Sequence, residues 1–506
     1  MQDTGNLFSE LSSNWPDSEK VALESGGGKR YRFGDVADAS ARLANALAAL
    51  GVKPGDRVAV QVEKSPEALF LYLACLRAGA VYLPLNTAYT QAELDYFLRD
   101  AGPAVFVCRP EHAEAGTKLC ANAGVAHCHT LGTAGSGSIM TLTHAQSSAF
   151  ASVPRGPDDL AAILYTSGTT GRSKGAMLTH GNLSSNARAL IETWRFTSED
   201  VLLHALPIFH THGLFVASNV ALMSGASMLF LPKFDPDEIF RLLPRATAMM
   251  GVPTFYVRML ADPRLTREAA QHVRVFISGS APLLPDTFRG FLERTGHAIL
   301  ERYGMTETGM NTSNPYDGER VPGTVGRPLP GVELRIANPE TGEILEAGEI
   351  GMIEVRGPNV CKGYWRMPDK TKAEFRVDGF FITGDLGKID ALGCVHILGR
   401  GKDLVISGGY NVYPKEVESE IDALGGVAES AVIGVAHPDF GEGVVALVVK
   451  TQSGLTEAVI LEPLKQRLAN YKLPKRVLFV ESLPRNAMGK VQKNLLRDSY
   501  RDLFSR

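Results

Sequence analysis

The chain has 506 residues, more than a single hydrophobic core usually supports, so two or more domains are expected. Its composition, 44% hydrophobic and 21% charged, is typical of a globular protein, and a net charge of -3 provides no overall attraction to nucleic acid or to an acidic membrane. Six sparse, irregularly spaced cysteines indicate free thiols in a reducing compartment. Because no signal segment is visible at the N-terminus and each long apolar stretch is interrupted, we expect a cytoplasmic protein.

Residues 31–150 alternate between helical and strand patterns. Apolar residues at helical spacing predict helices over 33–50 and 66–77, and short apolar runs predict strands over 56–62 and 79–85. This alternation is typical of a layered α/β domain with a largely parallel sheet.

The stretch from Tyr165 to Gly175, YTSGTTGRSKG, follows the apolar run 160–164, so a buried strand leads into a polar, glycine-rich loop. Glycines let backbone N–H groups converge on an anion, and hydroxyls and Lys174 add hydrogen bonds and charge, which suits the phosphates of ATP. The spacing is not that of a Walker A motif, because glycine rather than serine or threonine follows Lys174. Such clusters are also common in solvated turns, and the loop's residues alone leave that alternative open.

A helix over 182–194 and a strand over 201–207 lead to His210 and His212. Two residues apart on a strand, both imidazoles would share one face, where they could act as metal ligands or general bases. No third ligand lies near them, and the cysteines and histidines of 120–129 lack a second ligand pair at zinc-finger spacing, so neither group is expected to bind metal.

Two further short strands, over 275–277 and 298–300, end in polar motifs. The first leads into Ser278-Gly279-Ser280-Ala281-Pro282 and the second into Glu301-Arg302-Tyr303-Gly304-Met305-Thr306-Glu307. The carboxyl ends of parallel strands are where α/β sheets bind ligands. In the second motif, Tyr303 offers a flat surface for a base, Thr306 a hydroxyl for a phosphate and Glu307 a hard oxygen for Mg²⁺.

Beyond residue 325, glycine-rich strand patterns over 349–355, 379–383 and 395–398 predict a small β subdomain. Asp385 follows one of these strands and is suited to bind a ribose diol, with an exposed turn aspartate as the alternative. The charged, glycine-containing run 399–403 is typical of a hinge.

The remaining segment predicts a compact α+β module. Helices are expected near 415–424 and 462–469, and a strand pair across 429–435 and 443–450. Lys490 follows a glycine in a proline-bounded loop, where it can project freely, although propensity alone makes it one of several surface lysines.

The motifs at 165–175, 301–307, 383–387, 400–414 and 490 resemble, in order and approximate spacing, those of the adenylate-forming superfamily, which holds acyl-CoA synthetases, peptide-synthetase adenylation domains and beetle luciferase. The resemblance covers nearly the full chain. It implies an α/β fold, with a large multi-subdomain N-terminal domain over 1–401 and a small mobile α+β C-terminal domain over 402–506, joined by a hinge near Lys402. It also implies two half-reactions, in which a carboxylate attacks the α-phosphate of Mg·ATP and a thiol, usually coenzyme A, then displaces AMP.

The resemblance also implies roles for individual residues. Lys490, Thr306 and Glu307 are the expected catalytic residues, with Glu307 and Thr170 at the magnesium ion. ATP would be bound by Thr166, Ser167, Gly168, Thr169, Thr170, Gly171, Lys174, Gly279, Ser280, Ala281, Glu301, Arg302, Tyr303, Gly304, Asp385 and Arg400. The acid would contact His210, Arg258, Ser280 and Met305, and CoA would pass Ser407, Gly408, Gly409 and Tyr410.

The run from Gly251 to Arg258, with the two polar motifs downstream, looks like the malonyl-CoA synthetases. Arginine pairs with carboxylate in bidentate fashion, so Arg258 is the candidate for binding a second carboxylate, while a solvated arginine is the alternative from the residues alone. The resemblance therefore implies a malonate–CoA ligase, with methylmalonate as a second candidate substrate.

Two other functions stay open: a ligase for another short acid, and an adenylation module that loads a separate carrier protein. A nucleotide-binding sensor without turnover is a third reading. Acetylation of Lys490 would remove the charge that adenylation needs, which makes a lysine acetyltransferase a candidate partner.

Overall fold

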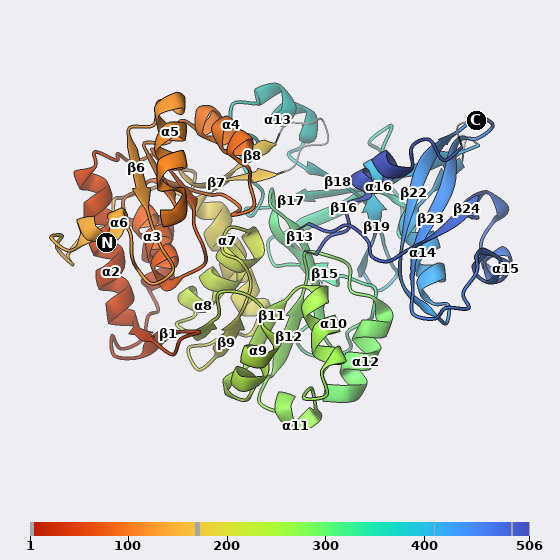
Figure 1. The fold of residues 1–506 in the computed structure, drawn as a ribbon, viewed down its shortest axis with the longest axis horizontal. Helices are drawn as coiled ribbons and strands as arrows, with labels where there is room; N and C mark the ends of the chain where they lie inside the picture. The colour runs from red at the N-terminus through yellow and green to blue at the C-terminus, as the bar shows by residue number, and fades with distance from the viewer. Residues whose placement is uncertain (1–4, 167–172, 409, 487–488, 505–506) are drawn as a thin grey trace. The chain divides into compact units, whose positions relative to one another are not determined.

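The computed structural model describes residues 5–166, 173–408, 410–486 and 489–504 (Figure 1). Its internal contacts divide the chain into two compact units, the first comprising Met1–Glu333 and Val355–Phe381 and the second comprising Leu334–Glu354 and Ile382–Arg506. The small β sheet thus groups with the C-terminal module, and the boundary predicted after residue 401 falls inside the second unit. The hinge at Lys402 stays a prediction.

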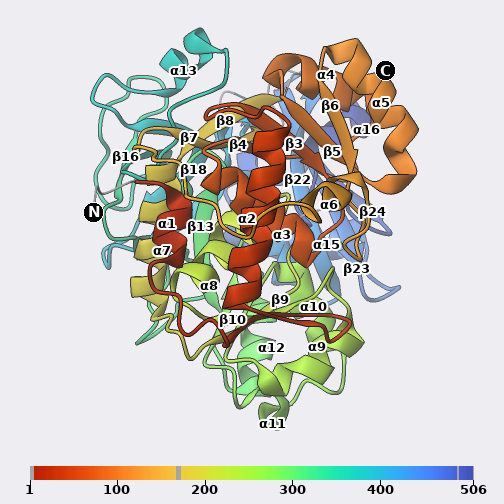
Figure 2. The ribbon, with the colours of Figure 1, turned by 90° about the vertical axis from the view of Figure 1, so that its left-hand side faces the viewer.

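The first unit contains a six-stranded sheet in the order β6-β5-β3-β4-β7-β8. Its strands are parallel except for the antiparallel pair β7–β8. The strands are β3 (Arg57–Gln61), β4 (Val81–Pro84), β5 (Val105–Cys108), β6 (His127–Thr130), β7 (Leu160–Thr166) and β8 (Lys174–Thr179). Apolar side chains of α4 (Gln91–Ala101) and α5 (Ala113–Ala123) pack with strand residues in one core. Figure 2 shows α2 (Phe33–Ala49) and α3 (Pro66–Arg77) side by side.

A second sheet of the first unit has nine strands in the order β15-β14-β13-β12-β11-β9-β10-β1-β2. These strands are β1 (Val21–Ser25), β2 (Arg30–Arg32), β9 (Val201–His204), β10 (Ser227–Phe230), β11 (Ala248–Gly251), β12 (Val275–Ser278), β13 (Leu300–Met305), β14 (Gly309–Ser313) and β15 (Arg327–Pro328). Helices α9 (Pro236–Leu242), α10 (Pro253–Ala261) and α12 (Pro285–Thr295) contribute apolar side chains to the core that covers the central strands.

The other helices of the first unit are α1 (Leu7–Ser12), α6 (Ser138–Thr143), α7 (His180–Trp194), α8 (Asn219–Met223), α11 (Arg267–Ala270) and α13 (Pro368–Glu374), a π-helix over His212–Ser218, and 3-10 turns over Pro110–His112 and Leu243–Arg245. The apolar stretches after Leu69 and Leu214 are core segments that run into strands β4 and β10, as the sequence predicted. Within the described ranges, no helix combines the length and apolar character needed to cross a bilayer.

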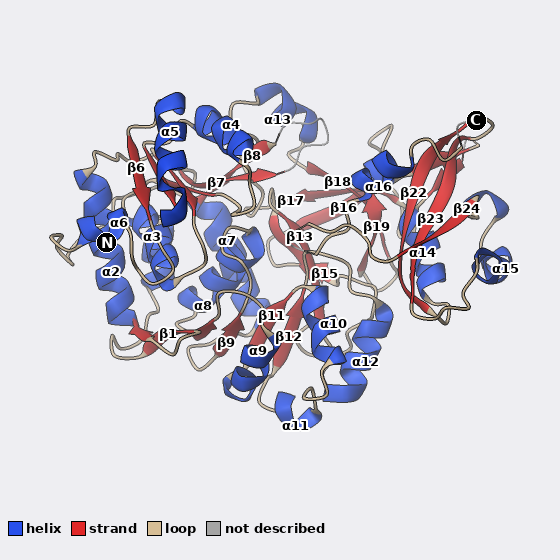
Figure 3. Ribbon diagram, in the orientation of Figure 1, coloured by secondary structure: helices blue, strands red, loops and turns tan. Residues whose placement is uncertain are grey.

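The second unit holds a four-stranded sheet, β16-β17-β18-β19, and a sheet ordered β21-β20-β23-β22 with β24 beside β23, as the red strands of Figure 3 show. Its strands are β16 (Glu333–Ala337), β17 (Gly351–Arg356), β18 (Phe381–Ile389), β19 (Val395–Arg400), β20 (Val405–Ser407), β21 (Tyr410–Val412), β22 (Val427–His437), β23 (Gly441–Lys450) and β24 (Arg476–Val480). Its helices are α14 (Pro414–Asp422), α15 (Glu457–Arg467), α16 (Lys493–Tyr500) and 3-10 turns over Gly401–Asp403 and Asn470–Lys472. The predicted strand pair of the C-terminal module is confirmed as the antiparallel pair β22–β23.

Two local predictions were wrong. His210 and His212 do not share a strand, because β9 ends at His204 and His212 begins the π-helix. The strand expected over 298–300 instead begins at Leu300 and runs through the polar motif to Met305, because residues 302–305 pair with β14 in an antiparallel hairpin.

Candidate active site

Strands β7 and β8 bring Thr166 and Lys174 opposite each other. The two are register partners in the antiparallel pair. The predicted phosphate-binding residues Ser167, Gly168, Thr169, Thr170 and Gly171 lie outside the described residues.

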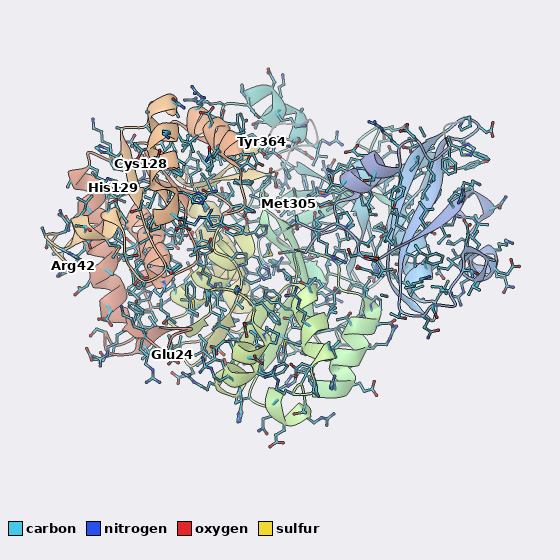
Figure 4. The ribbon with its side chains drawn as sticks, in the orientation of Figure 1. Glu24, Arg42, Cys128, His129, Met305 and Tyr364 are labelled. Carbon is cyan, nitrogen blue, oxygen red and sulfur yellow. The ribbon has the colours of Figure 1, made fainter. Side chains whose placement is uncertain are left out.

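A continuous network of polar side chains joins Lys174 to the predicted magnesium ligand Glu307. Lys174 Nζ lies 3.0 Å from Oε1 of Glu374, and the Tyr364 hydroxyl contacts Oε2 of Glu374 and lies 3.2 Å from Oε1 of Glu307. Oε1 of Glu307 also accepts a 3.3 Å hydrogen bond from the Thr166 hydroxyl. Figure 4 labels Tyr364, the central member of this network.

The charges of this network are fixed by its surroundings. Burial, and then the negative charge of Glu307, raise the pKa of Tyr364 and keep its phenol protonated. Although burial opposes it, hydrogen bonds from Lys370, Tyr364 and Lys174 lower the pKa of Glu374. The Tyr364 hydroxyl therefore faces two carboxylates with a single proton to donate, and Lys174 and Lys370 both pair with Glu374 as cations.

A second group of predicted residues meets where β12 ends. The Ser280 hydroxyl lies 3.2 Å from Nδ1 of His212, and Ser280 holds a left-handed backbone conformation with φ of 72°. Gly279 lies directly on the Arg302 guanidinium, because a Cβ added at Gly279 would be 2.4 Å from its Cζ. Only glycine therefore permits this close approach.

Arg302 is the most unusual side chain of the site. It is only 3% exposed, and its Nε and Nη2 have no hydrogen-bond partner in the described part of the protein. Burial lowers its pKa to about 9. A buried guanidinium without a partner is costly, and an anionic ligand would remove that cost.

The two histidines beside Arg302 are neutral. Burial, reinforced by the Arg302 charge, lowers the pKa of His210 to about 4 and lowers that of His212 as well. His212 Nε2 and the Ser278 hydroxyl are buried and, like the Arg302 nitrogens, have no partner within the described residues. Among the residues that the structure describes, the surroundings of Arg302 thus combine its cation with neutral donors, and its Nε and Nη2 make no hydrogen bond to a carboxylate.

Arg258, the arginine singled out for the acid pocket, lies elsewhere on its helix. It is exposed on α10, and its guanidinium lies 6.0 Å from the centre of the Phe234 ring. The neighbouring Tyr256 points inward and donates a 2.6 Å hydrogen bond to the carbonyl of Ile277, which ties α10 to β12.

A buried pair that no sequence pattern indicated contacts the π-helix. Lys64 Nζ lies 2.9 Å from Nδ1 of His204, and Nε2 of His204 lies 2.9 Å from the carbonyl of Gly213 in the π-helix. Burial lowers the pKa of both Lys64 and His204. In the sequence, Lys64 is a lysine just before a helix, with no feature that suggests a special role. Its burial in the structure distinguishes it from the surface lysines.

In the second unit, Asp385 and Arg400 are register partners on β18 and β19, joined by a 2.9 Å ion pair. Asp385 is 4% exposed, so the alternative of an exposed turn aspartate is wrong. Reduced hydration, and then the Arg400 charge, lower the pKa of Lys490, while Asp385 and Asp403 act in the opposite direction. These three predicted residues therefore share one electrostatic environment.

The predicted CoA-binding residues lie on the hairpin β20–β21 of the same unit. Ser407 is buried, Gly408 donates a 2.8 Å hydrogen bond to the carbonyl of Phe440, and Gly409 lies outside the described residues. Tyr410 is 59% exposed and stacks on Tyr471 at 4.7 Å. The hairpin thus presents an aromatic surface to solvent.

The chain is similar to known proteins over nearly its whole length. A family model for AMP-binding enzymes matches residues 10–365, and one for the C-terminal domain of AMP-binding enzymes matches residues 416–490. ATP-bound MatB from Rhodopseudomonas palustris has the same fold, with a TM-score of 0.97 and 62% identity over 99% of this chain and 100% of that one. A feruloyl-CoA synthase from an Amycolatopsis species is 38% identical, over 93% of this chain and 94% of its own. The malonate–CoA ligase of Arabidopsis thaliana is 35% identical, over 97% of this chain and 88% of its own.

Proposed function

The chain belongs to the family of AMP-binding enzymes, and we propose that it is a malonate–CoA ligase, converting malonate, ATP and CoA into malonyl-CoA, AMP and pyrophosphate through an acyl-adenylate. The similarity to a malonate–CoA ligase supports the choice of acid. Methylmalonate is the second acid we expect it to accept.

The observation that carries the proposal is the buried, unpaired guanidinium of Arg302. A fatty or aromatic acid would cover Arg302 with apolar surface and leave its charge unsatisfied, whereas a second carboxylate would pair with it. The hydroxyls of Ser278 and Ser280 and the imidazole of His212 add neutral donors around the same point.

We therefore assign the distal carboxylate of the substrate to Arg302 in place of Arg258. The two positions differ in burial, since Arg258 is exposed and Arg302 is buried. His210, Ser280 and Met305 keep their proposed place in the acid pocket.

The other predicted roles are proposals that the geometry supports. Glu307, with the Thr166 hydroxyl beside it, offers the hard oxygens that Mg²⁺ prefers. Among the described residues no group of three or more His, Cys, Asp or Glu side chains could hold a metal, which fits an ion carried mainly by ATP phosphates. When bound, that ion would neutralise phosphate charge; Lys174 would bind the phosphates, and Asp385 and Arg400 the ribose.

Lys490 is the proposed adenylation lysine, because a mobile cation can stabilise charge that develops on the phosphate oxygens. Its acetylation by a lysine acetyltransferase would remove that cation. We further infer a cytoplasmic location, with the small molecules ATP, CoA and the acid as partners.

The test is pyrophosphate release with Mg·ATP and CoA across acetate, malonate, methylmalonate, succinate, octanoate and ferulate. We expect malonate to be preferred, and Arg302→Met to lower kcat/KM for malonate at least ~30-fold, the loss typical of removing one partner of a buried charge pair, with acetate much less affected. Arg258→Met, on the exposed face of α10, is the matched control and should stay within about twofold.

Preference for octanoate or ferulate would show that malonate is not the substrate. The proposal that the enzyme is an acid–CoA ligase would be unaffected. Equal activity with a purified carrier protein and no CoA would instead favour the adenylation module.

A further inference from the structure

Three of the six cysteines lie close together in the six-stranded sheet of the first unit and the helix α5 that packs on it. Cys108 ends β5, and Cys120 lies on α5. Cys128, labelled in Figure 4, lies on the edge strand β6. Cys108 and Cys120 belong to one buried cluster, and Cys128 packs against it. This group, which we call the thiol cluster, has no part in the site described above.

A glycine in the middle of α5 makes room for the cluster. A Cβ added at Gly116 would lie 2.8 Å from the Cys108 sulfur and 3.3 Å from the Cys128 sulfur. Glycine inside a helix is destabilising by roughly 0.5–1 kcal/mol relative to alanine. The space above Gly116 is therefore taken up by two sulfur atoms at a cost to the helix.

The three thiols differ in exposure. Cys108 and Cys120 are 1% and 3% exposed, whereas Cys128 is only half-buried. Hydrogen bonds from Cys108 and then Cys120 lower the pKa of Cys128, with Thr117 and the neighbouring His129 contributing, while the pKa values of Cys108 and Cys120 are raised. The accessible sulfur is thus also the one that its neighbours stabilise as a thiolate, and a thiolate is the nucleophilic form of cysteine.

We propose that Cys128 is a modification site, a peroxide-reactive thiolate that Cys120 resolves to a disulfide. In the first step the Cys128 thiolate attacks one oxygen of a hydroperoxide, the O–O bond breaks, and hydroxide or alkoxide leaves and takes up a proton. In the second step the Cys120 thiol loses its proton and attacks the sulfenic sulfur, the S–S bond forms and the S–O bond breaks, releasing water. The two thiols supply two electrons. Hydrogen peroxide is thereby reduced to two water molecules, and an organic hydroperoxide to one alcohol and one water molecule.

The register of the sheet selects Cys120 as the resolving thiol. Cys128 lies opposite Phe106, and Cys108 lies two residues further along β5. From ordinary strand spacing and rise, the Cα atoms of Cys108 and Cys128 are about 8 Å apart, too far for a disulfide without a shift of a paired strand. Cys120 lies near the end of the helix α5, just before the C-cap Gly124, and is not part of the sheet. It can therefore move toward Cys128 without shifting a paired strand.

The test treats the full-length, pre-reduced protein with hydrogen peroxide at pH 7, blocks free thiols at intervals, and maps the peptides by mass spectrometry. Cys394 is the internal control, since it is also half-buried but lies just before β19 in another sheet. We expect Cys128 to be lost at least ~10-fold faster than Cys394 and a Cys120–Cys128 peptide to form. In Cys120→Ser, a dimedone adduct should instead accumulate at Cys128.

Oxidation of Cys128 no faster than Cys394 would overturn the proposal, and a Cys108–Cys128 linkage would overturn the choice of resolving thiol. The measurement on the unmodified sequence needs no variant to fold. It is independent of which acid the enzyme activates.

Discussion

At the scale of single residues, Tyr364 links the proposed magnesium ligand to the phosphate-binding lysine. Its hydroxyl contacts Glu307 and Glu374, and Glu374 holds Lys174. We predict that Tyr364→Phe raises the KM for Mg²⁺ about three- to tenfold, because Glu307 loses a neutral donor that positions it, the effect of about one hydrogen bond. The measurement is pyrophosphate release as a function of free Mg²⁺, with kcat at saturating Mg²⁺ compared separately.

Tyr31→Phe is the matched control for this variant. Tyr31 also donates to a carboxylate, 2.8 Å from Oε1 of Glu67, but lies on β2 at the edge of the nine-stranded sheet. Both variants remove one phenol hydroxyl from a tyrosine–glutamate pair, so a shared loss would indicate general destabilisation. An unchanged Mg²⁺ dependence in Tyr364→Phe would show that Tyr364 does not position Glu307.

Arg302 gives a second prediction at this scale, and its readout is stability rather than activity. Because the guanidinium is buried and unpaired, we expect Arg302→Met to leave the free energy of unfolding unchanged or to raise it, even as malonate turnover falls. Denaturant titration of the ligand-free enzyme checks this. A loss of several kcal/mol would mean that Arg302 supports the fold, and the fall in activity would then say nothing about substrate binding.

Compact motifs in the sequence suggested candidate site residues, and they did not indicate contact partners that come from distant segments. Glu307, Lys174 and Asp385 were predicted from their local motifs. Tyr364 and Glu374 were missed, because their role depends on contacts with residues far away in the chain. Burial of Arg302 and exposure of Arg258 likewise follow from the packing of β12, β13 and α10, which no local pattern reveals.

At the scale of elements, the π-helix shapes the wall of the acid pocket. Its second residue, Gly213, lies against the preceding turn so closely that an added Cβ would be 2.0 Å from the carbonyl oxygen of Pro207. That oxygen belongs to the backbone and cannot rotate away. Helical periodicity predicts neither this close approach nor the π-helix, whereas the regular helices α2 and α3 were predicted nearly to the residue.

We predict that Gly213→Ala shifts the start of the π-helix and with it His212, lowering kcat/KM for malonate at least ~10-fold, as small displacements of positioning groups do. Gly290→Ala is the control, because Gly290 lies inside α12 with its nearest neighbour 3.8 Å from an added Cβ. That substitution should stabilise the protein by about 0.5–1 kcal/mol, the helical preference for alanine. Thermal melts and malonate kinetics of both variants are the measurements, and normal kinetics in Gly213→Ala would contradict the prediction.

At the scale of the whole molecule, the second unit is built from two separate stretches of the chain. Residues Leu334–Glu354 leave the first unit, and the chain returns to the first unit over Val355–Phe381 before it completes the second. The boundary predicted at 401 rested on the family resemblance and on the hinge-like run 399–403, neither of which indicates that an earlier segment joins the second unit. The small sheet instead contains strands from both stretches, because β17 pairs with β18. The β18–β19 pair also carries the Asp385–Arg400 ion pair.

The division of labour between half-reactions supplies the last prediction. With Lys490 as the proposed adenylation cation, Lys490→Gln, which also mimics acetylation, should slow pyrophosphate release by about 100- to 1,000-fold, the cost of losing one preorganised charge on the reacting phosphate. Thioester formation from preformed malonyl-adenylate and CoA should stay within a few fold. Lys465→Gln, an exposed lysine on α15 paired with Glu462, is the control.

The pH dependence provides an independent check on the same residue. Because the pKa of Lys490 is lowered by reduced hydration and by Arg400, the ammonium is present at low pH and is lost as pH rises through a value below that of an ordinary lysine. Adenylation should therefore decline on the alkaline side earlier than an unperturbed lysine would allow, and the decline should be absent from the thioester step. If both half-reactions lose activity together, in the variant or at high pH, Lys490 serves the fold or both steps, and its assignment to adenylation fails.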